Sequence, residues 1–372
     1  MLGLCGFVLL LLFSTQVGSA RTQSTVKQIG APVWTLAMDW PRVAYASGQD
    51  RKSESIRVWN VATGATSAVD GGRSTDAVQY AGGLLLSGTR VVWIRAQQIG
   101  NTNLDYRLYS APVGGSAHLL KAMHGLTGIY CDKGPAMGGL AGSRSAVVVS
   151  TWDAGPDGTK PSKQRLALVG PSALSTVATG AKAIVSQSVD GGHIAVLPLP
   201  TFSFTYDNGC NYATLPANVL VYSTTGALLA KVPLPPRDPT TDPGGYQVAI
   251  RGNRLVVLAR GLHEPSGPAW VTLSVYDWTK PKYKRLHTWP VAIPLYPGEA
   301  NFSFYGHVAA VEGYSDLHLV NLDTGKDVVI APSSQTGCST ALGPQGLVYA
   351  LNSYTAGQLV FVPMAKLLQL VS

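Results

Sequence analysis

The stretch RVAYAS at residues 42–47 decides the fold, because six more segments of the same kind follow it along the chain. Each is rich in β-branched and small apolar residues, and each follows a short turn that contains Gly or Pro. The six are RVVWIR (90–95), SAVVVS (145–150), HIAVLP (193–198), RLVVLA (254–259), HVAAVE (307–312) and GLVYAL (346–351). This composition between turn residues predicts a strand at each of the seven places.

A further strand is predicted after each of these segments. In SIRVWN (55–60), Ile56 and Val58 alternate with Arg57, and period two indicates a strand with one face more buried than the other. Similar stretches begin at residues 106, 164, 219, 272, 317 and 358. Thr-Gly pairs at 63–64, 225–226 and 324–325 predict hairpin turns into one more strand. With an apolar strand ahead of each segment, the unit has four strands.

Repetition of a four-stranded unit every 40 to 60 residues is the signature of a β-propeller. We therefore expect an all-β fold, a seven-bladed β-propeller of four-stranded antiparallel blades, with six or eight blades as alternatives. A β-sandwich or two small barrels would have similar strands, but neither explains a fixed strand order with turns at matching places. Residues 24–29 and 366–371 both have the pattern of outer strands, so the two ends of the ring are expected to meet in one blade.

One repeat carries a family resemblance. VWNVATG (58–64) is similar to the end of the third strand of a WD40 repeat, with Asn60 where Asp is usual. Gly-His pairs at 192–193 and 306–307 stand at the start of second strands. The chain resembles the WD40-like and TolB-like group of propellers, which implies the fold. It leaves the function open, because propellers include scaffolds, receptors, lyases, lactonases and oxidoreductases.

The first residues of the chain predict export. FVLLLLF (7–13) is a short apolar run followed by the small residues Gly18, Ser19 and Ala20, which is the outline of a secretory signal peptide. Seven apolar residues are too few for a membrane-spanning helix, which needs about 20. We expect a signal peptide at 1–20, a single propeller domain at 21–372, and a secreted or periplasmic (cell-envelope) protein without a transmembrane span.

Composition excludes several classes of protein. The 372 residues include 41 Gly and 24 Pro, and only 13% of them are charged. Coiled coils, helical repeats and disordered chains need many charges or few large apolar residues, so none of them fits. The net charge of +8 predicts weak attraction to anionic polymers or membrane surfaces. Because export is expected, nucleic acid is not an expected partner.

Three cysteines follow the signal peptide: Cys131, Cys210 and Cys338. An odd number in an exported chain allows one disulfide and a free thiol, or an intermolecular bond. The segments around Cys131 and Cys210 belong to neighbouring units on the same face, so a Cys131–Cys210 disulfide is expected. Three buried thiols behaving as small apolar residues are the alternative.

Long loops are expected on one face of the ring. They join second to third strands, or one blade to the next, whereas the opposite face has turns of two to five residues. The expected long loops cover residues 48–54, 96–105, 152–163, 198–216 and 261–270, with interblade segments 123–137, 235–246 and 294–300. Loops on a rigid scaffold usually carry binding. We therefore expect a monomeric binding or scaffold protein that recognises a protein, peptide or glycan there.

A hydrolase, lactonase or lyase with its site at the mouth of the central channel is the alternative. No catalytic residue, metal ligand or cofactor is predicted, because the sequence contains no Gly-x-Ser-x-Gly, P-loop, His-Glu-x-x-His or dinucleotide motif. In this alternative a divalent cation would sit among polar side chains of the long loops. The candidate ligand-binding residues, common to both hypotheses, are Asp153, Asp207, Asp238, Asp242, His263 and Glu299.

Overall fold

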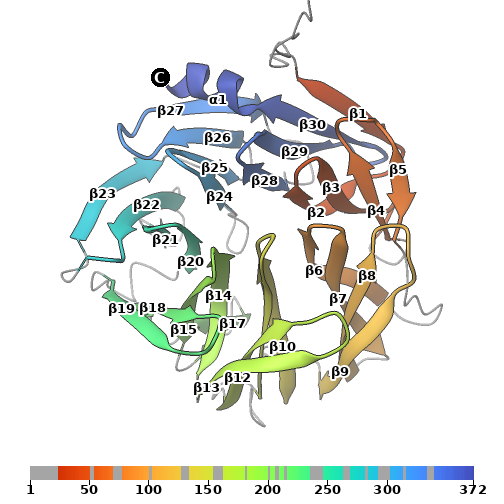
Figure 1. Cartoon of the computed structure of the whole chain (residues 1–372), viewed down its shortest axis with the longest axis vertical. Helices are drawn as coiled ribbons and strands as arrows, with labels where there is room; N and C mark the ends of the chain where they lie inside the picture. Colours follow the sequence, from red (N-terminus) through yellow and green to blue (C-terminus); the bar gives the residue numbers. More distant parts are fainter. Residues whose placement is uncertain are drawn as a thin grey trace, which may run out of the picture.

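The computed structural model describes residues 24–50, 54–69, 78–99, 103–126, 134–153, 162–180, 182–199, 202–205, 209–212, 216–234, 246–262, 269–280, 284–291, 302–312, 316–332 and 339–372. Seven four-stranded antiparallel sheets surround a central axis (Figure 1). The predicted seven-bladed propeller is confirmed, and the alternatives of six or eight blades are excluded. Every predicted second and third strand is present, with its start shifted by three residues at most.

Each blade consists of four strands. The first strand lies nearest the central axis, and the second, third and fourth strands follow it outward. Blade 1 has β2 (Val33–Asp39), β3 (Arg42–Ser47), β4 (Ser55–Asn60) and β5 (Thr66–Ala68). Blade 2 has β6 (Val78–Ser87), β7 (Arg90–Ile99), β8 (Asn103–Pro112) and β9 (His118–Leu126). Blade 3 has β10 (Pro135–Gly142), β11 (Val147–Asp153), β12 (Ser162–Val169) and β13 (Leu174–Gly180). Blade 4 has β14 (Ala183–Asp190), β15 (His193–Leu199), β18 (Asn218–Ser223) and β19 (Leu228–Pro233).

The remaining blades follow the same order. Blade 5 has β20 (Tyr246–Arg251), β21 (Arg254–Leu262), β22 (Ala269–Asp277) and β23 (Lys284–Val291). Blade 6 has β24 (Phe302–Tyr305), β25 (Val308–Glu312), β26 (Asp316–Asn321) and β27 (Asp327–Pro332). Blade 7 has β28 (Thr340–Gly343), β29 (Gly346–Asn352), β30 (Gly357–Pro363) and, outermost, β1 (Thr25–Ile29). The first strands of neighbouring blades touch around the whole ring, and contact between β28 and β2 closes it.

The two ends of the described chain meet in blade 7. β1 pairs with β30 in antiparallel register, from Thr25 opposite Phe361 to Ile29 opposite Gly357. The prediction that both ends share one blade is therefore confirmed, but the strand expected at 366–371 is wrong. This segment is the helix α1 (Met364–Val371), because β1 already occupies the outer edge of blade 7. Leu367 and Val371 lie one helical turn apart and are buried against blades 6 and 7.

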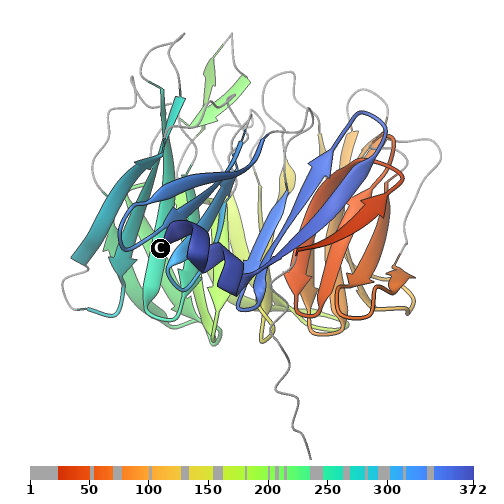
Figure 2. The same ribbon diagram turned by 90° about the horizontal axis from the view of Figure 1, so that it is seen from above.

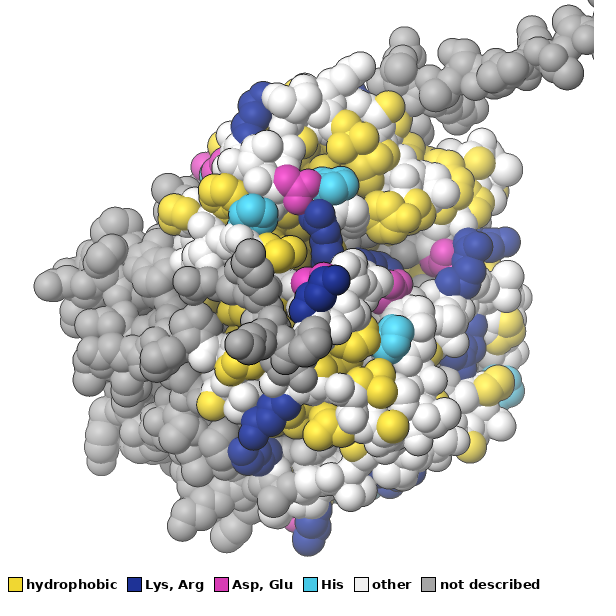
Figure 3. Space-filling model, turned by 60° about the vertical axis from the view of Figure 1, so that its left-hand side comes forward, with side chains coloured by type: hydrophobic (Ala, Val, Ile, Leu, Met, Phe, Trp, Pro, Cys, Tyr) yellow, Lys and Arg dark blue, Asp and Glu magenta, His cyan; other side chains and the backbone are white. Residues whose placement is uncertain are grey.

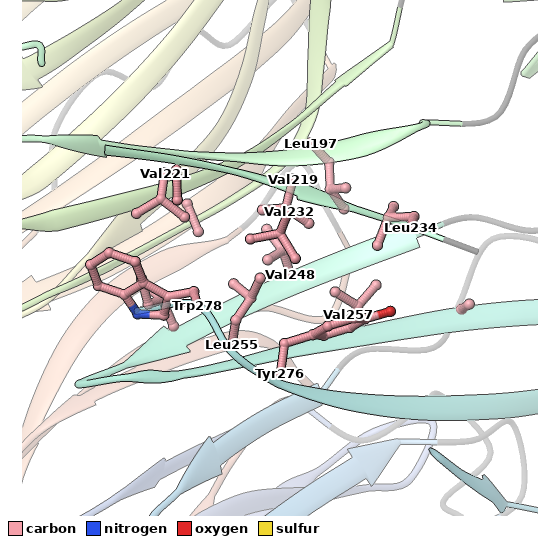
Figure 4. Packing of buried hydrophobic residues seen from close by; sticks show 14 residues of the cluster. Leu197, Val219, Val221, Val232, Leu234, Val248, Leu255, Val257, Tyr276 and Trp278 are labelled. Atoms are coloured by element: carbon pink, nitrogen blue, oxygen red, sulfur yellow. The ribbon is translucent and has the colours of Figure 1, made fainter. Parts of the chain in front are cut away.

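The core lies between the blades. Seven clusters of buried apolar side chains fill the seven boundaries between neighbouring blades. At the boundary of blades 4 and 5, Val221 and Leu197 face Leu255, Tyr276 and Trp278 (Figure 4). Inner strands are thus covered on both faces, which explains the scarcity of charged residues. Within the described residues, no helix has the length and apolarity that a membrane crossing requires.

One face of the ring carries the short turns between first and second strands, and we call it the tight-turn face; the opposite face is the long-loop face (Figure 2). On the tight-turn face, an acidic residue at the end of a first strand binds the turn of the next blade. Asp39 accepts a hydrogen bond from Gly88 N (2.6 Å), and Asp190 accepts one from Gly252 N (2.8 Å). Both glycines have positive φ, which Gly adopts without strain and which aims the N–H at the carboxylate.

Ion pairs reinforce these turns. Arg144 of blade 3 lies 3.0 Å from Asp39, and Arg251 lies 3.0 Å from Asp190. Arg254 of blade 5 reaches Asp323 of blade 6 at 3.0 Å. On the described surface, several basic side chains accordingly lie beside acidic ones (Figure 3). Hydrogen bonds and ion pairs on the tight-turn face therefore connect the blades.

Candidate functional site

One of the six candidate residues from the sequence, Asp153, lies in the described part of the chain. It ends β11 at the long-loop face, and its Oδ2 lies 3.3 Å from Nζ of Lys163, whose side chain is 80% exposed. Its carboxylate is therefore paired within blade 3. The other candidates and two of the cysteines fall outside the described residues: Asp207, Asp238, Asp242, His263, Glu299, Cys131 and Cys338. Cys210 belongs to β17 (Gly209–Tyr212), but its side chain is also outside the description, so the Cys131–Cys210 bond stays a prediction.

The described residues bring together no group of three or more His, Cys, Asp or Glu side chains that could hold a metal ion. A different set of polar residues lies between blades 1 and 2. We call it the polar seam: Glu54, Arg95, Gln97, Asp105 and His124. Glu54 comes from blade 1, and the other four from β7, β8 and β9 of blade 2.

Strand register explains why the seam residues share one face of blade 2. Gln97 stands opposite Asp105, and Asp105 stands opposite His124, so the three form one row across the sheet. Arg95 is two residues from Gln97 on the same strand and therefore points the same way. Farther toward the tight turns, Trp93 occupies this face and packs into the apolar cluster between blades 1 and 2. The boundary is apolar near the tight turns and polar near the long loops.

The buried half of the seam is an ion pair. Arg95 and Glu54 are 1% and 0% exposed, and Nη1 of Arg95 lies 3.6 Å from Oε2 of Glu54. Nη2 of Arg95 also donates to the backbone oxygen of Glu54 at 3.3 Å. Two charges removed from water are tolerated because each compensates the other. The side chain of Gln97 is also buried, and its Oε1 has no hydrogen-bond partner among the described residues.

The open half of the seam is a carboxylate and an imidazole. Oδ1 of Asp105 lies 2.8 Å from Nδ1 of His124, and Arg107 lies 3.7 Å from the other oxygen of Asp105. Asp105 is buried, whereas the side chain of His124 is 75% exposed. A carboxylate that accepts the Nδ1–H leaves Nε2 of His124 as the free nitrogen. The pair can donate a proton to a bound group, accept one from it, or hydrogen-bond it.

The strands that carry the seam are longer than their sequence predicted. Residues 96–105 were expected to form a loop, and that expectation is wrong: β7 continues to Ile99 and β8 begins at Asn103. Glu54 of blade 1 lies against Arg95 at this boundary. The alternation of Arg95 and Gln97 with Ile94 and Ala96 was the signal of a strand, and it also marked the two polar residues that share one face.

The long-loop face differs from the tight-turn face in two further ways. The hairpin of β16 (Phe202–Thr205) and β17 stands on this face between β15 and β18, outside the seven sheets (Figure 2). In blades 2 and 5 the second and third strands reach nine or ten residues, so they extend the sheet toward this face. The hairpin and the strand extensions thus both lie on the long-loop side of the ring.

Comparison with known proteins supports no family assignment: no family model matches the chain, and no curated protein matches it. Among solved structures, a chain of the Saccharomyces cerevisiae complex of Dbp5 bound to Nup159 and Gle1 is 10% identical, with 91% of this chain and 94% of that chain covered and a TM-score of 0.46. The N-terminal domain of Nup159 is also 10% identical, at 91% and 95% coverage and a TM-score of 0.45.

A prolyl endopeptidase is 13% identical with a TM-score of 0.43, and the match covers 87% of this chain but only 54% of that enzyme. At such identities the likeness concerns the fold and gives no ligand. The fold itself is established by the seven blades: the chain is a seven-bladed β-propeller.

Proposed function

We propose that the chain is an exported, non-enzymatic propeller that binds a protein, peptide or glycan on its long-loop face. The observation that carries the proposal is the polar seam, in which the exposed imidazole of His124 lies beside a buried carboxylate near the long-loop end of β9, the outermost strand of blade 2. Hydrogen-bonding groups held by a rigid scaffold lose little entropy when they bind a ligand. The β16–β17 hairpin adds a second element on the same side.

The test compares His124 with His118, which lies near the opposite end of β9. Random peptides displayed on phage and a printed glycan array are screened against the full mature chain. Affinities of the selected ligands are then measured for wild type, for His124→Ala, and for a variant in which a Gly-Ser turn replaces residues 202–212. His118→Ala is the matched control, because His118 is an exposed histidine at the tight-turn end of β9.

Loss of at least roughly tenfold in affinity in either long-loop variant, with His118→Ala unchanged, supports the proposal; such a loss equals about 1.4 kcal/mol. Ligands that bind all variants equally contradict it, and so does a screen that yields no ligand. Export has its own readout: mass spectrometry of the secreted protein should find an N-terminus near Arg21. Peptide mapping without reduction should find the Cys131–Cys210 bond.

Hydrolysis is the second candidate, and the Asp105–His124 pair is the observation that favours it. A carboxylate that orients an imidazole is the base half of a nucleophilic site. Ester and lactone hydrolysis by the purified chain, abolished in His124→Ala and preserved in His118→Ala, would favour an enzyme over a binding protein. Metal analysis of the same sample tests for the divalent cation.

A further inference from the structure

A cavity of about 590 Å³ lies between blades 7 and 1. One wall is the inward side of β1, with Lys27 and Ile29, and the opposite wall is formed by β3, β4 and β5, with Tyr45 and Arg57. β1 and β5 are the outermost strands of their blades and lie side by side (Figure 1). The volume lies within the range of small-molecule sites, about 300–1,000 Å³.

The charged side chains among the described residues that line this cavity are all positive. Lys27 and Arg57 line it, and no Asp or Glu is among the described residues that line it. Other basic side chains of the described chain, such as Arg95, Arg144 and Arg254, have a carboxylate at 3.0–3.6 Å. Within the described residues, Lys27 and Arg57 have none: Nζ of Lys27 lies 6.0 Å from the centre of the Trp59 ring, and Arg57 is exposed. The cavity thus presents two positive charges that nothing described neutralises.

Hydrogen-bond donors accompany the two cations. Tyr45 is 2% exposed and stands opposite Arg57 in the sheet. Burial raises the pKa of Tyr45 although the charge of Arg57 opposes the shift, so the phenol keeps its proton and can donate. Ser47 and Ser55 add hydroxyl groups beside it. An acceptor of several hydrogen bonds with a negative charge is the complement of this set.

The end of the cavity is fixed by hydrogen bonds of Gln49 and Gly48, which follow β3. Nε2 of Gln49 donates to the backbone oxygens of Gly30 and Thr355, each at 3.0 Å. Gly48 N donates to the oxygen of Pro32 at 3.1 Å, and the indole of Trp34 donates to Gly48 O at 3.0 Å. The bonds of Gln49 hold the segment after β3 against blade 7, and the bonds of Gly48 hold it against the start of blade 1. The cavity is therefore preorganised and does not depend on a ligand for its shape.

We propose that this cavity is a binding site for a small organic anion, a carboxylate or a phosphate monoester, whose charged group meets Arg57 and Lys27. The planar guanidinium of Arg57 suits the two oxygens of such a group, and Lys27 supplies a second charge. A single inorganic ion would fill only a small part of 590 Å³, so the rest of the ligand lies against Ile29 and the Tyr45 ring. The site is separate from the polar seam and does not rest on the function proposed for it.

Three probes of similar size test the charge requirement: benzoate, phenyl phosphate and the neutral benzamide. Each is titrated into the mature chain at low salt while NMR follows the methyl signals of Ile29. The variants are Arg57→Ala and Lys27→Ala, with Arg42→Ala as the matched control, because Arg42 starts β3 at the tight-turn end of the same blade. Arg57 is exposed, so its removal leaves the core intact, and the spectrum of each variant shows whether it is folded.

We expect saturable shifts of the Ile29 methyl signals with at least one of the two anions. The affinity should fall at least roughly tenfold in Arg57→Ala and in Lys27→Ala, and it should not change in Arg42→Ala. Preference for benzoate identifies a carboxylate ligand, and preference for phenyl phosphate identifies a phosphate ester. The proposal is overturned if neither anion saturates, if benzamide binds as tightly as benzoate, or if Arg57→Ala binds the anions like wild type.

Discussion

The two ends of the blade boundaries are built from different chemistry. At the tight-turn face, a carboxylate of one blade binds a backbone N–H of the next, as in Asp39 with Gly88 and Asp190 with Gly252, and these groups remain partly in contact with water. Near the long-loop face, blades 1 and 2 meet through the fully buried charges of Arg95 and Glu54. The first arrangement is present at two of the described boundaries, whereas the second depends on both buried partners.

The difference predicts where the molecule is most sensitive. Arg95→Met removes the described cation beside the buried carboxylate of Glu54, and breaking a buried ion pair by removal of one partner costs about 3–5 kcal/mol. Urea unfolding of the variant measures this loss of stability. The matched control is the double variant Arg95→Met/Glu54→Leu, which should recover most of it because no charge stays buried. A loss below 1 kcal/mol in the single variant, or no recovery in the double one, would contradict the role of the pair.

At the tight-turn face, Asp39→Ala should cost less. It removes the hydrogen bond to Gly88 and the pair with Arg144, and a hydrogen bond to a charged group is worth about 1.5–3 kcal/mol. Arg144→Ala separates the two contributions, since the side chain of Arg144 is 72% exposed and an exposed pair is worth at most about 1 kcal/mol. Equal losses in both variants would show that the ion pair, and not the bond to Gly88, joins the blades.

Acidic pH should weaken the ion pairs of the tight-turn face. Burial alone would raise the pKa of Asp323, but hydrogen bonds and positive charge from His307 and Arg254 outweigh it and hold the pKa below its usual range. A carboxyl whose pKa is lowered by folding stabilises the protein above its unfolded pKa, near 4, and this contribution is lost as pH falls through the folded pKa. Between pH 5 and 2 the stability gap between wild type and Asp323→Asn should therefore narrow. A constant gap would contradict the assignment.

The sequence predicted the ring better than it predicted the site. RVAYAS and its six counterparts are buried on both faces, so their composition reports burial directly. The buried Arg95 pairs with Glu54, 41 positions earlier in another blade, and no local pattern shows such a contact. α1 was missed for a similar reason: MAKLLQLV forms a helix because β1, at the far end of the chain, already fills the edge of blade 7.

The smallest effect is expected at the long-loop rim of blade 3. Asp153 pairs with Lys163, which is 80% exposed, so Asp153→Ala should change the free energy of unfolding by no more than about 0.5 kcal/mol. Lys163→Ala is the control, because it breaks the same pair and leaves the carboxylate. If Asp153 contacts a ligand, as expected from the sequence, Asp153→Ala weakens binding of the ligands selected on the long-loop face while Lys163→Ala does not. Equal affinities in the two variants would show that Asp153 does not contact the ligand. Ligand recognition on that face would then depend on His124 and the β16–β17 hairpin.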